Sequence, residues 1–330
     1  MIGAGLGTAS LLAVGLYLVR RWRSARWGRV TSAARLTGRV VVVTGANTGL
    51  GSHAAEEFVR RGAIVVLACR NRDNTAATLT RLQRLPGPGT AEFLQLDLSS
   101  LASVRLAAAE LLDRHPAIHA LVCNAGVWHP MEQAARTKDG VEAHAGINHL
   151  GHFLLTALLL DRLAESAPAR VVVVSSSLQS QGKLDLTGTD HFKAGRQPEP
   201  GSRSFAPTGY CDSKLMNALF TKELAGRTAG RGVTAVCLCP GWCYTQLARH
   251  TNIPTYKKLL FLPIAFMFMR SGARGAENIV QAVVADEQQI VSGGFYRECK
   301  LAAEEEVKLT AMAETGRQLW DISERLAGLQ

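Results

Sequence analysis

The sequence predicts an α/β protein with a single Rossmann-type, doubly wound parallel sheet, helices on both faces, and an N-terminal membrane-anchor helix. Short apolar runs alternate with helix-length segments, and a glycine-rich turn follows the first run. Such alternation is typical of βαβ units, whose right-handed crossovers build a parallel sheet. An uncharged stretch at the N-terminus predicts the anchor. The 330 residues suffice for one large α/β domain or two small ones.

The N-terminal segment predicts a retained membrane anchor. Residues 1–19 carry no charge, and about 20 apolar residues cross a bilayer as a helix. Seven arginines follow before the first acidic residue, Glu56. The positive-inside rule keeps that side in the cytosol, and a signal peptide would carry its positive charge ahead of the apolar core. We therefore expect a transmembrane anchor over 1–19, a basic juxtamembrane linker over 20–37 and a cytosol-facing catalytic domain over 38–330.

Charge and cysteine content argue against two other classes of protein. Much of the net charge of +10 lies beside the expected anchor, where arginines can meet anionic lipid headgroups. No zinc-finger or helix-turn-helix context accompanies it, so we expect no nucleic-acid partner. The seven scattered cysteines show no disulfide framework, which indicates reduced thiols. Cys237, Cys239 and Cys243 lack a partner pair at finger-like spacing, so we expect no metal site.

Seven apolar runs are expected to be strands. In chain order they are Arg39–Thr44, Ala63–Ala68, Glu92–Leu96, Ala120–Cys123, Arg170–Ser175, Val233–Cys239 and a short run near Gly294–Arg297. The helices expected between them include Leu101–Arg114, Val141–Glu165, Tyr210–Ala229 and Ala273–Asp286. Residues 179–207 form a long polar loop, and a loop of that length inside a domain usually borders a site.

A glycine-rich turn follows the first expected strand. Residues 44–51 (TGANTGLG) have the spacing G-x-x-x-G-x-G, and residues 53–61 open a helix. Glycine lets the backbone approach a pyrophosphate, while the helix N-terminus supplies unpaired N–H groups and a partial positive charge. A strand before and a helix after are the context in which this motif predicts a dinucleotide site. The residues expected to line it are Gly45, Ala46, Asn47, Thr48, Gly49, Leu50 and Gly51.

The end of the second expected strand predicts which dinucleotide binds. An enzyme that uses NAD places Asp or Glu here to hold the ribose 2′-hydroxyl, whereas arginine accommodates a 2′-phosphate. Residues 70–72 read Arg-Asn-Arg, with no acid. Arg70 can pair with the phosphate through its planar guanidinium group, although a solvated arginine at a strand end is the alternative. The missing acid favours NADP(H).

Residues 210–214 (YCDSK) carry the second chemical signal. On a helix, residues four apart share a face, so the Tyr210 hydroxyl and the Lys214 ammonium can point to one place. The ordinary tyrosine pKa of about 10 is too high for acid–base work at neutral pH. A nearby ammonium and a positive nicotinamide ring would both lower that pKa. By itself the pattern also fits a core-facing tyrosine and a surface lysine.

Further polar positions favour the catalytic interpretation. Ser176 follows the fifth expected strand, where open α/β sheets bind ligands, and it can donate a hydrogen bond to a carbonyl oxygen. A serine in a strand-end turn is the alternative. Asn148 is an amide within an apolar helix, where it competes with helical hydrogen bonds, so we expect a kink that holds a water beside Lys214. The small residues after the fourth strand suit close packing along a cofactor, and they are Asn124, Ala125 and Gly126.

Together these motifs resemble the short-chain dehydrogenase/reductase family, across roughly Thr37 to Gln330. The matching elements fall in family order and are TGANTGLG, Asp97-Leu98, CNAG, INHLGHF, the serines after the fifth strand, YCDSK, and Pro240-Gly241 with Thr245. Within the family the chain is similar to the microsomal retinol dehydrogenases, on the segments INHLGHFLLT, LMNALFTKELA and LWDISERLAGL. The gap between Ser176 and Tyr210 is long, so the loop over the substrate differs.

The resemblance implies a function for each motif. The implied catalytic tetrad is Asn148, Ser176, Tyr210 and Lys214. Asp97 and Leu98 would lie at the adenine, and Asn124, Ala125 and Gly126 along the cofactor. Pro240, Gly241 and Thr245 would form the loop over the nicotinamide. The subgroup further implies that the anchor lies in the endoplasmic reticulum membrane.

The expected reaction interconverts a lipophilic alcohol and its carbonyl with NADP(H), most favourably retinol and retinal in the direction of reduction. Tyr210 would give its proton to the carbonyl oxygen, Ser176 would steady that oxygen, and Lys214 would hold the nicotinamide ribose. The same chemistry on a steroid ketone or a lipid aldehyde is the first alternative, and a weakly active cofactor-binding scaffold is the second. A hydrolase is disfavoured because no serine lies in a G-x-S-x-G elbow.

An apolar stretch near the C-terminal third predicts a contact with lipid or protein. Residues 259–269 (LLFLPIAFMFM) are interrupted by Pro263 and too few to span a bilayer. They could form a lipophilic substrate lid that dips into the membrane interface. A buried core helix or a dimer contact would explain them equally well, so a homodimer stays open.

Overall fold

In the described part of the chain, eight strands form one sheet in the order β3-β2-β1-β4-β5-β6-β7-β8. This computed structural model describes residues 14–129, 135–197, 206–244 and 255–330. Neighbouring strands are parallel except for β7 and β8. Because the order reverses between β1 and β4, the sheet is doubly wound. The strands are β1 (Val40–Thr44), β2 (Ile64–Cys69), β3 (Thr90–Gln95), β4 (Ala120–Cys123), β5 (Ala169–Val174), β6 (Val233–Cys239), β7 (Phe295–Arg297) and β8 (Lys300–Leu301).

The four valines of β1 show why the sheet is buried on both faces. Val40 and Val42 belong to one apolar cluster, while Val41 and Val43 belong to the other. Alternate side chains of a strand point to opposite faces, so a continuous run of β-branched residues suits a strand with helices above and below it. Burying each valine contributes on the order of 2 kcal/mol.

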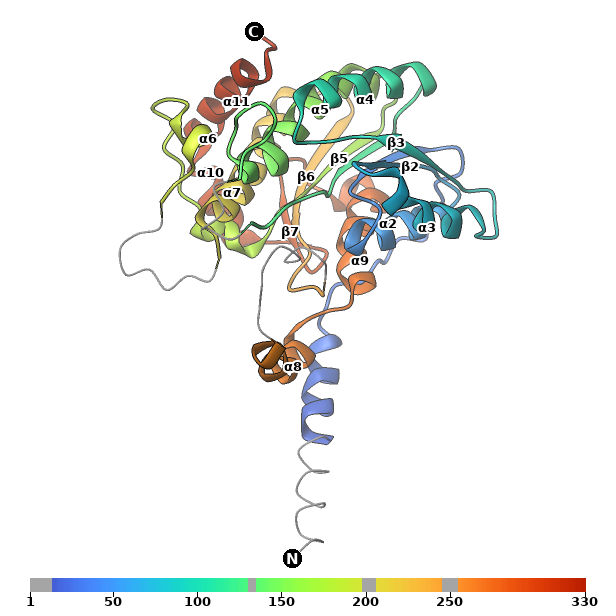
Figure 1. Cartoon of the computed structure of the whole chain (residues 1–330). Coiled ribbons are helices and arrows are strands. Elements are labelled where there is room, and N and C mark those ends of the chain that lie inside the picture. Colours follow the sequence, from blue (N-terminus) through green and yellow to red (C-terminus); the bar gives the residue numbers. More distant parts are fainter. Residues whose placement is uncertain (1–13, 130–134, 198–205, 245–254) are drawn as a thin grey trace, which may run out of the picture.

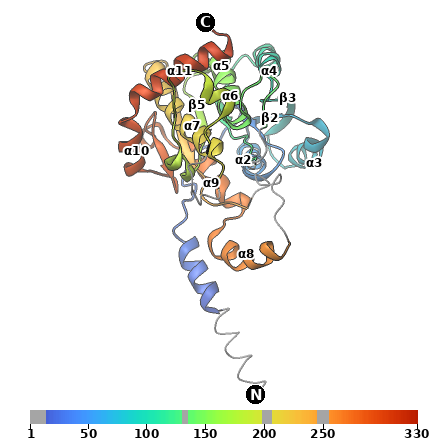
Figure 2. The same cartoon turned by 60° about the vertical axis from the view of Figure 1, so that its left-hand side comes forward.

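Helices cover both faces of the sheet (Figures 1 and 2). One face carries α4 (Leu101–Arg114), α5 (Gly151–Glu165), α7 (Thr208–Arg227) and α11 (Ala313–Ala327), and the other carries α2 (Gly49–Arg60), α3 (Arg72–Gln83) and α9 (Gly272–Val284). Aromatic rings join three helices of the first face, because Trp320 of α11 packs against Phe153 and Phe220 with centroid distances of 4.9 and 5.9 Å. This packing fixes α7, which carries the predicted site residues Tyr210 and Lys214, against the sheet.

The predicted strands and helices are present, and most of their ends differ by one or two residues. One expected helix is divided, since residues 145–150 form a π-helix, η1 (Ala145–Leu150), before α5. The short helix η2 (Ser177–Gln181) overlaps the start of the expected long loop over 179–207, and the short helix α6 (Asp190–Ala194) lies within it. Further elements are not among those expected from the sequence. They include the helices α3, α10 (Ala303–Thr310) and α11 and the antiparallel edge strand β8.

The N-terminal region is described only from residue 14 onward, so most of the expected anchor over 1–19 lies outside the described residues. They begin within a helix over 14–24. Among the helices that the structure describes, none is both long enough and apolar enough to cross a bilayer. The anchor therefore stays a prediction.

Part of the expected basic linker is hydrogen-bonded to the folded domain. The backbone N–H groups of Gly28 and Val30 donate to the carboxylates of Glu298 and Glu277, at 2.8 and 3.1 Å. The N–H of Thr31 likewise donates to Gln281 Oε1 of α9 at 3.0 Å. A Cβ at Gly28 would meet the backbone of Glu298 at 2.2 Å, so glycine permits this close approach. This part of the basic segment is thus an integral part of the folded domain.

Helix α8 (Thr255–Phe268) projects beside the helix over 14–24, away from the sheet (Figure 1). The guanidinium groups of Arg20 and Arg23 lie 4.5 and 4.4 Å from the ring centroids of Phe266 and Phe268. The expected alternative of a buried core helix is wrong for the described side chains of α8, because most of its large apolar groups face solvent. The exposed ones are Leu260, Phe261, Leu262, Ile264, Phe266 and Phe268.

Candidate active site

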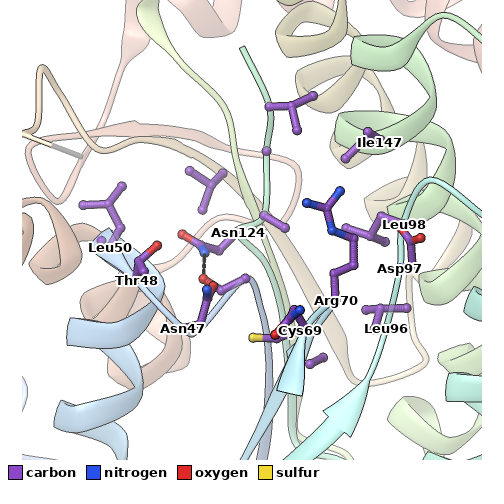
Figure 3. Close-up of a pocket in the computed structure, with 18 of the residues that line it drawn as sticks. Asn47, Thr48, Leu50, Cys69, Arg70, Leu96, Asp97, Leu98, Asn124 and Ile147 are labelled. Atoms are coloured by element: carbon purple, nitrogen blue, oxygen red, sulfur yellow. Dashed lines mark hydrogen bonds between the residues drawn. The ribbon is translucent and has the colours of Figure 1, made fainter. Parts of the chain in front are cut away.

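A cavity of about 550 Å³ opens at the carboxyl ends of the parallel strands, next to the point where the strand order reverses (Figure 3). Open α/β sheets bind ligands at this place. Most of the predicted site residues meet there. The cavity wall contains Gly45, Asn47, Thr48, Gly49, Leu50, Arg70, Asp97, Leu98, Asn124, Ala125, Gly126, Tyr210, Lys214 and Pro240. Ala46, Gly51, Asn148, Ser176 and Gly241 lie behind or beside the wall, and Thr245 is outside the described residues.

The glycine-rich turn is built so that two positions exclude any side chain. Gly45 has a φ of +64°, in the left-handed region that favours glycine. At Gly51 a Cβ would lie 2.5 Å from Asn124 Nδ2 and 2.7 Å from the Gly45 carbonyl oxygen. Asn124 closes the turn from β4, since its Nδ2 donates to the Thr44 carbonyl oxygen at 2.8 Å. The backbone is therefore exposed to the cavity at the N-terminus of α2, which fits a diphosphate.

Arg70 reaches into the cavity from the end of β2, as Figure 3 shows. Asn71 caps α3 by accepting a hydrogen bond from the Asn74 N–H at 2.8 Å, so the cavity edge here is made of a guanidinium and two amide side chains. Asp97 follows the neighbouring strand β3 and also lines the cavity, but Ser99 and Lys138 already contact its carboxylate. Burial raises the pKa of Asp97, yet these contacts outweigh it and hold that pKa below its usual value.

Tyr210 and Lys214 lie one turn apart on α7 and face the cavity together, at 4% and 3% exposure. The Lys214 Nζ atom lies 5.5 Å from the centroid of the Tyr210 ring and donates to the Val174 carbonyl oxygen at 3.0 Å. The prediction that Lys214 lowers the pKa of Tyr210 is wrong where only groups of the protein act on the phenol. Burial raises the pKa of Tyr210, against a smaller lowering by its hydrogen bond with Ser176. Burial also lowers the pKa of Lys214 to about 8, because desolvation disfavours both charged forms.

Asn148 lies within the irregular part of its helix. Its buried amide lies in η1, where Oδ1 accepts from the Val127 N–H at 2.8 Å, and Nδ2 donates to the Val127 carbonyl and to Ser213 Oγ. A π-turn inside a helix widens it by one residue and is frequent at functional sites. The helix is irregular at Asn148, while the water expected beside Lys214 stays a prediction. The amide lies beside Gly126, where a Cβ would approach both Asn148 Oδ1 and Lys214 Nζ.

Sequence reasoning missed a buried hydrogen-bond chain behind the cavity. His152 Nδ1 lies 3.0 Å from the Asn148 carbonyl oxygen, and its Nε2 lies 2.8 Å from Thr44 Oγ1. The Thr44 oxygen also accepts from the N–H groups of Asn124 and Ala125. Burial lowers the pKa of His152 to about 4, so the ring is neutral and we assign its hydrogen to Nδ1. This chain of hydrogen bonds joins η1 to the two turns that line the cavity after β1 and β4.

Two further contacts hold the loops around the cavity. Asp212, buried within the YCDSK motif, pairs with Arg196 at 3.1 Å and accepts from the Lys183 N–H, which fastens the long loop onto α7. Arg270 lies against Gly241, where a Cβ would meet its guanidinium carbon at 2.6 Å, and it pairs with Glu298. No local sequence pattern around Asp212 or Arg270 indicates its ionic partner.

Comparisons with known proteins agree with this architecture. Residues 39–187 match the short chain dehydrogenase family. The chain is 39% identical to human retinol dehydrogenase 11, over 92% of this chain and 90% of that protein. It is 38% identical to human retinol dehydrogenase 14, over 99% and 96%. The crystal structure of an uncharacterized protein from Mycobacterium Paratuberculosis superimposes with a TM-score of 0.65 and 32% identity, covering 89% of this chain and 95% of that one. The chain therefore belongs to the short-chain dehydrogenase/reductase family, whose members are oxidoreductases that use a nicotinamide cofactor.

Proposed function

We propose that this chain is an NADP(H)-dependent oxidoreductase that reduces retinal to retinol. The observation that carries the choice of cofactor is Arg70, which enters the cavity where an NAD enzyme would hold an acidic residue. The glycine-rich turn and the cavity of about 550 Å³ fit a dinucleotide. When bound, NADPH supplies the hydride. The retinoid assignment draws support from the retinol dehydrogenases that this chain resembles.

The pKa shifts of the catalytic residues suit reduction. Burial keeps the Tyr210 phenol protonated at neutral pH, and a protonated phenol can give its proton to a carbonyl oxygen. Ser176 forms a hydrogen bond with Tyr210, so its hydroxyl is placed to orient the same oxygen. Lys214 is held from the Val174 carbonyl oxygen and is positioned to bind the nicotinamide ribose. Asn148 would hold a water that links Lys214 to solvent and so resupplies the proton.

We further propose that the enzyme binds the cytosolic face of the endoplasmic reticulum membrane. The helix over 14–24 and α8 together expose apolar side chains, and Arg20 and Arg23 stand between them. Apolar groups flanked by arginines suit an interface with anionic lipids. Trp242, in the loop after the cofactor-facing Pro240, packs against Phe261 of α8 with a centroid distance of 5.7 Å. A lipophilic substrate would thus leave the bilayer close to the cavity.

The deciding experiment assays the purified full chain in lipid vesicles against retinal, a long-chain aldehyde and a steroid ketone, each with NADPH and with NADH. We expect NADPH-dependent reduction of retinal to be fastest. Faster turnover of the steroid ketone or the aldehyde would support the alternative substrates instead. Cofactor binding without turnover of any carbonyl would indicate a scaffold, and a preference for NADH would overturn the argument from Arg70.

A further inference from the structure

A buried carboxylate–imidazole pair lies beside α7 and takes no part in the proposed proton transfer. His144 Nδ1 and Glu142 Oε1 are 2.6 Å apart, and the side chains are only 6% and 16% exposed. The other carboxylate oxygen, Glu142 Oε2, accepts from the Ala145 N–H that opens η1, at 2.8 Å. Burial raises the pKa of Glu142, but hydrogen bonds from His144 and the backbone outweigh it and hold the pKa below its usual value. Glu142 is therefore an ionised acceptor.

The second nitrogen of His144 holds the chain segment that follows β4. His144 Nε2 accepts a hydrogen bond from the backbone N–H of His129 at 3.0 Å. A ring nitrogen that accepts carries no hydrogen, so we assign the hydrogen to Nδ1, where it is donated to Glu142. Two residues earlier, Val127 is held at both its N–H and its carbonyl oxygen by the Asn148 amide. Side chains four residues apart on one helical segment thus fix the backbone on either side of Trp128.

Trp128 packs directly on the catalytic tyrosine. The centroids of the Trp128 and Tyr210 rings are 4.6 Å apart at an interplanar angle of 47°. The His144 ring meets Tyr210 edge-on, with a centroid distance of 6.2 Å. A Cβ at Gly209 would lie 2.9 Å from His144 Nδ1 and 3.0 Å from Glu142 Oε1, so the first turn of α7 also rests against the pair. The position of the Tyr210 ring therefore depends on both Trp128 and the Glu142–His144 pair.

We propose that Trp128 is a wall of the substrate site and that the Glu142–His144 pair positions it there. The wall of the cofactor-sized cavity includes Val127 and Tyr210 but, among the described residues, not Trp128. The indole ring thus contacts Tyr210 outside that cavity, where a carbonyl substrate must approach the phenol. A large, rigid aromatic face favours an extended apolar substrate over a short one. The inference rests on the proposed function and deepens it by assigning its preference for lipophilic carbonyls to Trp128.

The first test compares Trp128→Ala with Trp128→Phe in the full chain. We expect Trp128→Ala to raise the KM for retinal about tenfold while the KM for a short aldehyde changes less than about twofold. The Kd of NADPH, measured by cofactor fluorescence, should stay unchanged. Trp128→Phe keeps an aromatic face and should stay close to wild type. An unchanged ratio of the two KM values in Trp128→Ala would overturn the assignment of the wall.

The second test distinguishes the hydrogen bonds made by the two ring nitrogens of His144. In His144→Gln the amide oxygen can reach the place of Nε2 and accept from the His129 N–H, whereas in His144→Asn the amide reaches only the place of Nδ1, next to Glu142. We expect Gln to retain the wild-type KM for retinal and Asn to raise it as Trp128→Ala does. Equal KM values in these two variants would overturn the positioning role. A wild-type chain that reduces neither aldehyde with NADPH would instead contradict the proposed function.

Discussion

The Lys214 Nζ atom lies over the Tyr210 ring, 5.5 Å from its centroid, and directs its hydrogen bond to the Val174 carbonyl oxygen. The two side chains share one face of α7, but proximity does not decide their ionisation. Both are almost fully buried, so the loss of solvent raises the pKa of Tyr210 and lowers that of Lys214 to about 8. The phenol therefore stays protonated at neutral pH, as the proposed proton donor must be, and we expect Lys214 to act through its position.

Removing the phenolic hydroxyl tests the proton donor. We expect Tyr210→Phe to lower kcat for retinal reduction about 10³-fold, because general acid catalysis contributes roughly 10²–10⁴. The Kd of NADPH should stay within about twofold, since the ring and its packing on Trp128 are retained. Tyr296→Phe is the matched control, because Tyr296 accepts a hydrogen bond from the Val291 N–H at 2.7 Å, away from the cavity. Equal kcat values in the two variants would refute the assignment of the donor.

The lowered pKa of Lys214 predicts a pH-dependent stability. Between pH 8 and 10.5, the folded chain has released this proton while the unfolded chain still holds it. The free energy of unfolding should therefore rise with pH in that window, by at most roughly 1.4 kcal/mol per pH unit from this group. Lys214→Met removes the contribution, so the difference in Tm between wild type and variant should shift in favour of wild type from pH 7 to 9.5. A constant difference would show that Lys214 titrates near its ordinary pKa.

Arg70 is expected to select the phosphorylated cofactor. Arg70→Gln should raise the Kd of NADPH about tenfold and leave that of NADH almost unchanged, since about 1.4 kcal/mol corresponds to one exposed, charge-assisted contact. Arg72→Gln is the control, because its guanidinium lies 5.2 Å from the Phe93 ring centroid and is not part of the cavity wall. Isothermal titration with both dinucleotides gives the comparison. An equal rise in the Kd of NADPH and of NADH would mean that Arg70 does not contact the 2′-phosphate.

The geometry of the glycine-rich turn predicts that replacing glycine by alanine has different effects at Gly51, inside the turn, and at Gly226, outside it. Gly51→Ala forces a methyl group to within 2.5 Å of Asn124 Nδ2, so the turn must open. We expect NADPH binding to weaken at least about tenfold and the Tm to fall. At Gly226, near the end of α7, a Cβ meets no atom within 4 Å, and alanine favours helix by about 1 kcal/mol. Gly226→Ala should therefore keep full NADPH affinity with an equal or higher Tm.

The sheet was predictable because its determinants are local. A run such as residues 40–44 is apolar on both faces, and only a strand covered on both sides buries it. Helix α3 was missed because it buries only Thr75 and Leu82 and has little apolar periodicity, although Asn71 as its N-cap was a usable signal. Helix α11 also carried a usable signal, because its buried residues Leu319, Ile322 and Ala327 recur on one helical face.

The sequence predicted which residues line the site better than it predicted their protonation states. The spacing of Tyr210 and Lys214 indicates a shared face, but the depth of burial that controls their pKa values comes from the surrounding sheet and helices. Trp128 and His144 become neighbours of Tyr210 only when residues far apart in the chain fold together. No spacing rule connects such residues, so the sequence could not indicate the proposed role of Trp128.

The hydrogen bonds of Gly28 and Val30 to Glu298 and Glu277 have a practical consequence for soluble versions of this enzyme. Cutting the chain just before the first strand would remove the backbone N–H groups that donate to both carboxylates. One of them, Glu298, pairs with Arg270, whose guanidinium abuts the Pro240–Gly241 bend. A shortened protein that starts ahead of residue 27 retains those donors and the Trp27 ring that stacks on Arg270. The catalytic unit thus begins about a dozen residues upstream of its sheet.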